Sequence, residues 1–112
     1  MWSDPNDDIE DWLPNSRMAG WFFGRKVVQE FQEVNKVGMI VRAHQLVQEG
    51  YKWSFNKQLV TVWSAPNYCY KMNNKASIMK VDESLEHSFE VYGASPNNSK
   101  NVNYMHMLPY FL

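Results

Sequence analysis

One segment of this sequence has its apolar residues at helical spacing, and that segment limits what the chain can fold into. In residues 25–35, Val27, Val28, Phe31 and Val34 lie on one face of a helix, with charged and amide side chains around it. The other apolar runs are short and are bounded by Gly, Pro, Asn or Asp, which is typical of strands. The sequence therefore predicts an α/β chain of the α+β kind, with several strands and one main helix.

The turn residues divide the rest of the chain into short elements. Asn35 is expected to end the helix, and Asn56-Lys57 is expected to turn the chain between two paired strands. A short helical turn is predicted at residues 46–50 and a loop at residues 64–74. The predicted strands are residues 21–23, 37–41, 51–55, 59–63, 76–81 and 85–92.

The two ends of the chain look less regular. Residues 3–18 predict a solvated acidic loop, because Pro5 and Pro14 interrupt them and acidic side chains crowd between. We expect residues 1–92 to fold as one domain and residues 93–112 to form a flexible polar tail. The tail ends in an apolar stretch, which either docks on a partner or packs on this same chain.

Composition argues against several classes of partner. The formal charge is -1, with 11 basic and 12 acidic residues, so neither nucleic acid nor an anionic membrane is indicated. The single cysteine, Cys69, cannot form an internal disulfide, which favours a reducing compartment. No signal peptide and no apolar run long enough for a membrane span is visible. We therefore expect a cytoplasmic or nuclear protein.

Four segments occur in an order and spacing that resemble one enzyme family. They are Trp2-Ser3-Asp4-Pro5, Arg42-Ala43-His44-Gln45, Ser64-Ala65-Pro66-Asn67-Tyr68-Cys69-Tyr70 and Tyr110-Phe111-Leu112. The sequence thereby resembles the C-terminal part of serine/threonine phosphatase catalytic subunits of the phosphoprotein phosphatase family, in the 2A-like branch. The resemblance implies part of a calcineurin-like metallophosphoesterase β-sandwich with mostly antiparallel strands. It also implies hydrolysis of phosphoserine and phosphothreonine in proteins at a dinuclear metal centre.

The resemblance implies roles for four residues. His44 matches the last metal-binding His of the family, and Arg17 matches the Arg that grips the substrate phosphate. Tyr68 matches a loop Tyr that overhangs the active site and touches substrate, and Leu112 matches a C-terminal Leu that is methylated on its α-carboxylate. A guanidinium suits a phosphate because it can donate two parallel hydrogen bonds. The residues alone favour a structural role for His44, and from them Arg17 could equally form a surface ion pair.

The loops that carry Arg17 and Tyr68 depart from the family pattern. Ser-Pro-Arg-Gly in the family is Asn15-Ser16-Arg17-Met18 here, and Arg-Cys-Gly-Asn is Lys71-Met72-Asn73-Asn74. Loss of the Pro frees one backbone position. Loss of each Gly means that Met18 and Asn73 must accept the backbone angles that the Gly allowed.

The implied metal centre needs more ligands than this sequence offers. Two divalent ions, manganese or iron and zinc, would need about six Asp, Asn and His side chains. The family's Asp-x-His, Asp-Arg-Gly and Asn-His-Glu motifs lie upstream of residue 1, so this chain supplies one ligand, His44. We expect either a fragment of a longer gene product or a truncated relative, inactive alone. The implied partners are phosphoprotein substrates and regulatory or scaffold subunits, and the alternative is a non-catalytic module that binds regulatory subunits.

Overall fold

The computed structural model describes residues 2–96, which belong to two compact units. Within the described residues, the first unit comprises residues 2–44 and 52–61, and the second comprises residues 45–51 and 62–96. Two of the three boundaries fall inside neighbouring strands of one sheet, β5 (Tyr51–Ser54) and β6 (Leu59–Val62). Residues 97–112, most of the predicted tail, lie outside the described residues, so the tail stays a prediction.

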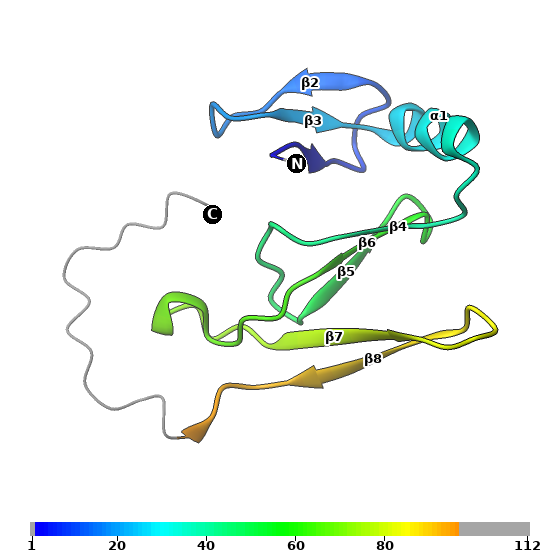
Figure 1. Ribbon diagram of the computed structural model, residues 1–112. Helices are drawn as coiled ribbons and strands as arrows, with labels where there is room; N and C mark the ends of the chain where they lie inside the picture. The colour runs from blue at the N-terminus through cyan, green and yellow to red at the C-terminus, as the bar shows by residue number, and fades with distance from the viewer. Residues whose placement is uncertain (1, 97–112) are drawn as a thin grey trace. The chain divides into compact units, whose positions relative to one another are not determined.

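A three-stranded sheet opens the first unit. It consists of β1 (Asp4–Pro5), β2 (Trp12–Pro14) and β3 (Trp21–Phe23), in the order β1-β3-β2 (Figure 1). β3 pairs in parallel with β1 and antiparallel with β2. The predicted strand at residues 21–23 is confirmed, but the prediction of an irregular segment at residues 3–18 is wrong for β1 and β2. Both strands are too short to show periodicity, and each ends in a Pro on an edge strand, where a missing N–H is tolerated.

The predicted helix is confirmed as α1 (Arg25–Asn35), which follows β3 directly (Figure 1). Its end differs by one residue, because Lys36 rather than Asn35 takes the left-handed backbone conformation, with a φ of 57°. Its apolar face is only partly covered: Val28 is buried, whereas the side chain of Val34 is 74% exposed. Phe31 on the same face is 51% exposed, so the face is covered near Val28 and open to solvent toward the end of the helix.

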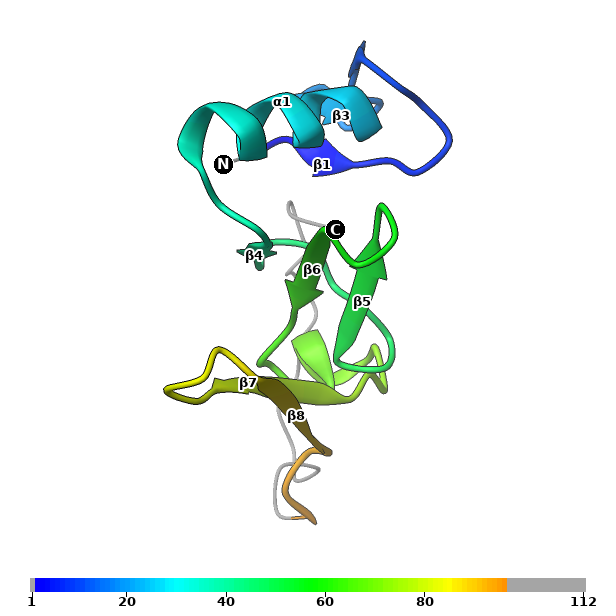
Figure 2. The same ribbon diagram turned by 90° about the vertical axis from the view of Figure 1, so that its right-hand side faces the viewer.

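The second sheet of the first unit contains β4 (Ile40–Arg42), β6 (Leu59–Val62) and β5 (Tyr51–Ser54), in that order (Figure 2). β4 runs parallel to β6, with Val41 opposite Val60. The predicted hairpin of β5 and β6 is confirmed, and Asn56 and Lys57 in its turn both have positive φ angles. The helical turn predicted at residues 46–50 is wrong. Those residues form a turn, an isolated β-bridge from Glu49 to Lys75 and a bend, and the Gly50 N–H donates to the Val47 carbonyl at 3.2 Å.

The core of the first unit joins the helix to both sheets. Its buried members are Val28, Phe55 and Leu59, and Phe23 and Ile40 pack against them. Phe23 and Phe55 contribute an aromatic pair with ring centroids 6.4 Å apart. These contacts link α1, β3 and the β5–β6 turn, so burial of apolar surface holds this unit together.

The second unit is built around the hairpin of β7 (Ala76–Val81) and β8 (His87–Tyr92). Its turn begins at Asp82, whose Oδ1 accepts the N–H groups of Ser84 and Glu86 at 2.8 and 2.9 Å. A short 3-10 helix, η1 (Tyr68–Tyr70), interrupts the loop before β7. Tyr51 stacks face to face on Phe89, with ring centroids 3.9 Å apart. The two predicted strands and their turn are therefore confirmed.

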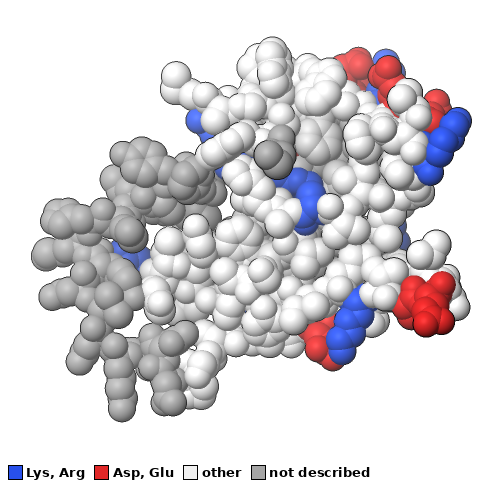
Figure 3. Space-filling model, viewed as in Figure 1, with Lys and Arg blue, Asp and Glu red and all other residues white. Residues whose placement is uncertain are grey.

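The arrangement agrees with the predicted α+β class: small sheets with antiparallel and parallel pairs, and one main helix. Among residues 2–96, none of the helices has both the length and the apolar character that crossing a bilayer would require. The face drawn in Figure 3 is covered mostly by uncharged residues. At its right-hand side acidic and basic groups lie close together, and further basic groups lie at its left margin and near its centre.

Candidate functional site

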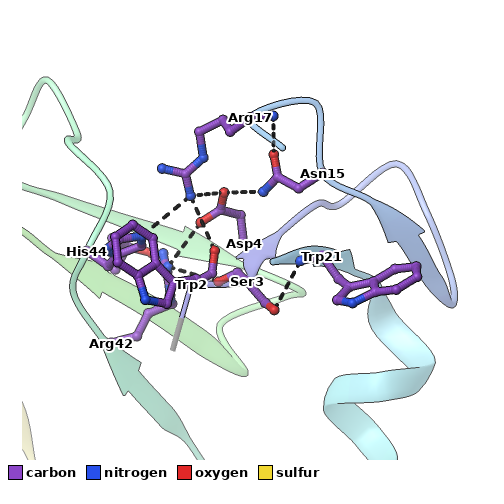
Figure 4. A network of polar contacts seen from close by, with 9 residues as sticks. Trp2, Ser3, Asp4, Asn15, Arg17, Trp21, Arg42 and His44 are labelled. Carbon is purple, nitrogen blue, oxygen red and sulfur yellow. Dashed lines mark hydrogen bonds and ion pairs between the residues drawn. The ribbon is translucent and has the colours of Figure 1, made fainter. Parts of the chain in front are cut away.

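The site lies in the first unit and is centred on the carboxylate of Asp4 in β1 (Figure 4). Its Oδ2 accepts a hydrogen bond from Asn15 Nδ2 at 2.7 Å and another from Arg17 Nη2. Its Oδ1 faces Arg42 Nη2 at 3.4 Å. Asp4 is 1% exposed, and a buried carboxylate is tolerated only when it is paired and hydrogen-bonded. The prediction of a solvated acidic loop is therefore wrong for Asp4.

The structure brings two predicted site residues together, Arg17 and His44. Arg17 Nη2 lies 3.5 Å from His44 Nε2, although the two residues are 27 positions apart. His44 is the second residue after the end of β4, and its φ of 81° is unusual for a residue with a side chain. The ring of Trp2 meets the His44 ring edge to face, with centroids 5.1 Å apart (Figure 4). Their convergence supports one common site, while their roles stay predictions.

Charged groups surround His44. The guanidinium groups of Arg17 and Arg42 both pair with the carboxylate of Asp4. Burial lowers the pKa of His44, and the charge of Arg17 lowers it further, although Asp4 acts in the opposite direction. Burial and the charge of Arg17 therefore both favour the neutral imidazole, which is the form that can bind a metal ion.

Arg17 is held by a tight turn over residues 15–18. The Met18 N–H donates to the Asn15 carbonyl at 3.1 Å, and the Arg17 N–H donates to Asn15 Oδ1 at 2.9 Å. Met18 has a φ of 60°. The expectation that Met18 must accept an angle suited to Gly is confirmed. Asn73 in the second unit behaves in the same way, with a φ of 51°.

The guanidinium of Arg17 is not fully satisfied. Its Nη2 donates to Asp4 and to the Trp2 carbonyl, the latter at 3.4 Å. Its Nε is buried and has no hydrogen-bond partner within residues 2–96. A buried donor without an acceptor costs free energy, and an oxygen-rich ligand that reached this group would relieve that cost.

Tyr68 belongs to the second unit, in η1. Its N–H donates to Asn74 Oδ1 at 2.7 Å, and its ring meets the Trp63 ring edge to face, with centroids 4.8 Å apart. Asn74 is buried and ties the loop together by donating to the Ala65 carbonyl as well. The loop that carries Tyr68 is thus well defined within its own unit. Leu112, the predicted methylation site, lies outside the described residues.

The described residues do not complete a metal centre. Within residues 2–96, the structure brings together no three His, Cys, Asp or Glu side chains that could hold a metal ion. His44 is one donor, and the nearby carboxylate of Asp4 is engaged by Arg17 and Arg42. The donor set therefore fits one ligand of a metal site and not a whole site.

An apolar groove of about 700 Å³ adjoins His44 in the first unit. It runs from the site to the exposed face of α1. Its lining residues are Ser3, Trp12, Phe23, Val27, Val28, Phe31, Ile40, Val41, Arg42, Ala43, His44 and Leu59. Trp12 and Phe31 are each about half exposed, so the groove offers apolar surface beside the polar cluster.

Sequence reasoning missed three members of the cluster: Asp4, Asn15 and Arg42. Asp4 and Arg42 stand within two of the motif segments, so the motifs themselves carried a signal. Asn15 had no such signal, because only the fold shows that its amide lies between Asp4 and the Arg17 backbone.

The chain is similar to known phosphatases. Residues 1–48 match the calcineurin-like phosphoesterase family. The chain is 58% identical over 103 residues to the serine/threonine-protein phosphatase ppe1 of Schizosaccharomyces pombe, covering 91% of this chain and 33% of that protein. Over its full length it is 46% identical to the serine/threonine-protein phosphatase 6 catalytic subunit of Caenorhabditis elegans, covering 34% of that protein. The segments Ala19-Gly20-Trp21 and Pro109-Tyr110-Phe111-Leu112 resemble protein phosphatase 6 within the 2A-like branch, and this last relative agrees with that resemblance.

A solved structure shares the fold. It is a protein serine/threonine phosphatase from Saccharomyces cerevisiae, described as similar to human phosphatase PP5. The TM-score is 0.75 at 26% identity, covering 85% of this chain and 33% of that one. The chain thus spans about a third of the length of the curated relatives it matches.

Proposed function

Because this chain belongs to the serine/threonine-protein phosphatases, we propose that it is the C-terminal part of a catalytic domain that hydrolyses phosphoserine and phosphothreonine in proteins. The observation that carries the proposal is the convergence of Arg17 and His44 beside Asp4. One residue suited to phosphate and one suited to a metal ion lie within 3.5 Å of each other. The chain then supplies one edge of an active site.

In this proposal each residue has a distinct task. Arg17 binds the substrate phosphate, and its unpartnered Nε gains an acceptor when it does so. His44 contributes one ligand to a divalent metal centre, which the family implies, and manganese or iron with zinc are the ions we propose. Tyr68 contacts the substrate from its loop. No step of the reaction is assigned through the metal ions, because the described residues do not form their full site.

We also propose binding partners and a cellular location for this protein. Phosphoproteins are the substrates, and regulatory or scaffold subunits bind the catalytic subunit. Methylation of Leu112 removes the charge of its α-carboxylate, which lowers the cost of burying the apolar end against such a subunit. A cytoplasmic or nuclear location fits a chain with a single cysteine.

A chimaera tests the catalytic proposal. Residues 1–112 replace the aligned region of the Schizosaccharomyces pombe relative, and phosphopeptide hydrolysis is measured with manganese. We expect activity that falls by at least about 10- to 100-fold in His44→Ala, because loss of a group that merely orients a metal ligand already costs that much. His87→Ala, at an exposed histidine in β8, is the matched control and should leave activity unchanged. A folded but inactive chimaera would contradict the proposal.

The isolated chain provides a second test. With manganese and a phosphopeptide it should show no metal-dependent turnover, because His44 cannot hold the metal centre alone. If the isolated chain hydrolysed the phosphopeptide and His44→Ala abolished that hydrolysis, the chain would hold more of the active site than the one edge that we propose.

The apolar groove favours a second candidate function, a non-catalytic module that binds regulatory subunits. Exposed apolar surface of this kind often marks an interaction site. The module predicts that the isolated chain pulls down a scaffold or regulatory subunit of a 2A-type phosphatase, and that deletion of residues 108–112 abolishes the interaction. Absence of binding by the intact chain would argue against it.

A further inference from the structure

We propose that Asn15 positions Arg17 for phosphate binding, an inference that rests on the proposed function of Arg17. Asn15 is 7% exposed, and its side-chain amide makes two hydrogen bonds at once (Figure 4). Its Nδ2 donates to Asp4 Oδ2 at 2.7 Å, while its Oδ1 accepts the Arg17 N–H at 2.9 Å. The amide therefore ties the backbone of Arg17 to the carboxylate that also holds the Arg17 guanidinium.

The turn around Arg17 needs this support. Residues 15–18 close through the hydrogen bond from the Met18 N–H to the Asn15 carbonyl, and neither Ser16 nor Arg17 has a positive φ. That pattern fits a type I turn, which favours Asn at the first position, Pro at the second and Gly at the fourth. Here Ser16 and Met18 occupy the second and fourth positions. Of these three positions, only the first holds a residue that a type I turn favours. We therefore expect the Asn15 side chain to be a main source of order in this turn.

An amide is the group that fits between these two partners. It carries a donor and an acceptor at opposite sides, and both are used here. A carboxylate at position 15 could accept from the Arg17 N–H but could not donate to Asp4, and it would place a like charge against Asp4. A Ser side chain is too short to span both partners. Fixing the backbone of Arg17 in this way reduces the freedom that phosphate binding would otherwise remove.

Nuclear magnetic resonance of the 112-residue chain tests the inference in two separate measurements. The first is the heteronuclear NOE of the Arg17 Nε–Hε group, which reports the order of the side chain. The second is the affinity for inorganic phosphate, titrated on the same signal. The variants are Asn15→Ser, the double variant Asn15→Ser with Ser16→Pro, and Asn35→Ser as a matched control, since Asn35 donates only to the Phe31 carbonyl at 2.8 Å on an exposed helix.

We expect Asn15→Ser to lower the order of Arg17 and to weaken phosphate binding about tenfold, the effect of losing one well-placed hydrogen bond. Adding Ser16→Pro should restore both to within about twofold, because Pro fixes the turn at its second position. Asn35→Ser should change neither. Rescue of this kind separates positioning from a simple loss of stability.

The outcomes distinguish the inference from the proposed function. An Arg17 side chain that stays as ordered in Asn15→Ser as in the parent chain overturns the inference. An ordered Arg17 that shows no response to phosphate contradicts the proposed role of Arg17, while the order measurement still decides the role of Asn15. If Asn15→Ser does not fold, Asn15→Ala is measured instead, because it lacks both hydrogen-bonding groups of the amide, and an undisturbed Arg17 in that variant overturns the inference.

Discussion

The backbone of Met18 offers a direct way to test whether the turn that carries Arg17 is strained. Met18 has a φ of 60°, and its side chain is 97% exposed. A left-handed conformation costs a residue with a Cβ atom about 1–2 kcal/mol, and Gly avoids that cost. Gly in turn adds about 0.5–1 kcal/mol of backbone entropy to the unfolded chain. Because the exposed side chain makes little contact, Met18→Gly should stabilise the first unit by about 0.5–1 kcal/mol.

Urea and thermal unfolding followed by tryptophan fluorescence measure this gain. Four of the five tryptophans, Trp2, Trp12, Trp21 and Trp53, lie in the first unit, so the signal reports mainly on that unit. For a chain of this length the expected gain corresponds to a rise in Tm of about 2–4 °C. Met18→Ala is the control, because it removes the side chain but keeps the Cβ atom and therefore the strain. It should leave stability within about 0.5 kcal/mol of the parent.

The reasoning would be refuted by a Met18→Gly variant that is no more stable than Met18→Ala. That result would mean that a Cβ atom in the left-handed conformation costs no more at position 18 than the backbone entropy that Gly adds to the unfolded chain. A lower stability for Met18→Gly would show that unfolded-state entropy outweighs the strain at this turn.

Two further predictions concern packing. Val28→Ala should destabilise the first unit by about 2 kcal/mol, because the Val28 side chain is buried in the core. Val34→Ala, on the same helix but largely exposed, should cost less than about 0.5 kcal/mol. Equal losses of stability in urea unfolding would contradict the assigned core. Gly50→Ala should cost more than about 2 kcal/mol, since φ is 92° and an added Cβ atom would lie 2.8 Å from the backbone of Ala76. Gly38→Ala, where a Cβ atom meets nothing within 4 Å, should be nearly neutral, and a similar loss in circular-dichroism melts of both variants would refute the steric reason.

Local patterns predicted much of the secondary structure. The helix at residues 25–35 shows in the period of its valines, and the β5–β6 and β7–β8 hairpins show in alternating residues around polar turns. The backbone conformation at two positions where the family pattern has Gly was also predicted correctly, because Met18 and Asn73 both adopt positive φ angles. The helix, the hairpins and these turn conformations depend on residues only a few positions apart, so the sequence alone predicts them.

Short elements could not be predicted in this way. β1 has two residues and β2 has three, and neither offers enough positions for a period to show. Their pairing with β3 supplies the hydrogen bonds that make them strands. The parallel pairs β1–β3 and β4–β6 likewise join segments that the local pattern does not connect.

The sequence by itself determined the family, the main helix and the hairpins, and it predicted Arg17 and His44 as site residues. Only the tertiary structure decided that Asp4 is buried, and that Asn15, Arg17 and Arg42 converge on its carboxylate. Arg17 is 13 positions and Arg42 is 38 positions from Asp4, and the sheets bring them together. A carboxylate in an acidic, Pro-containing segment looks solvated until its distant partners are known, because burial of a charge depends on the groups that neutralise it.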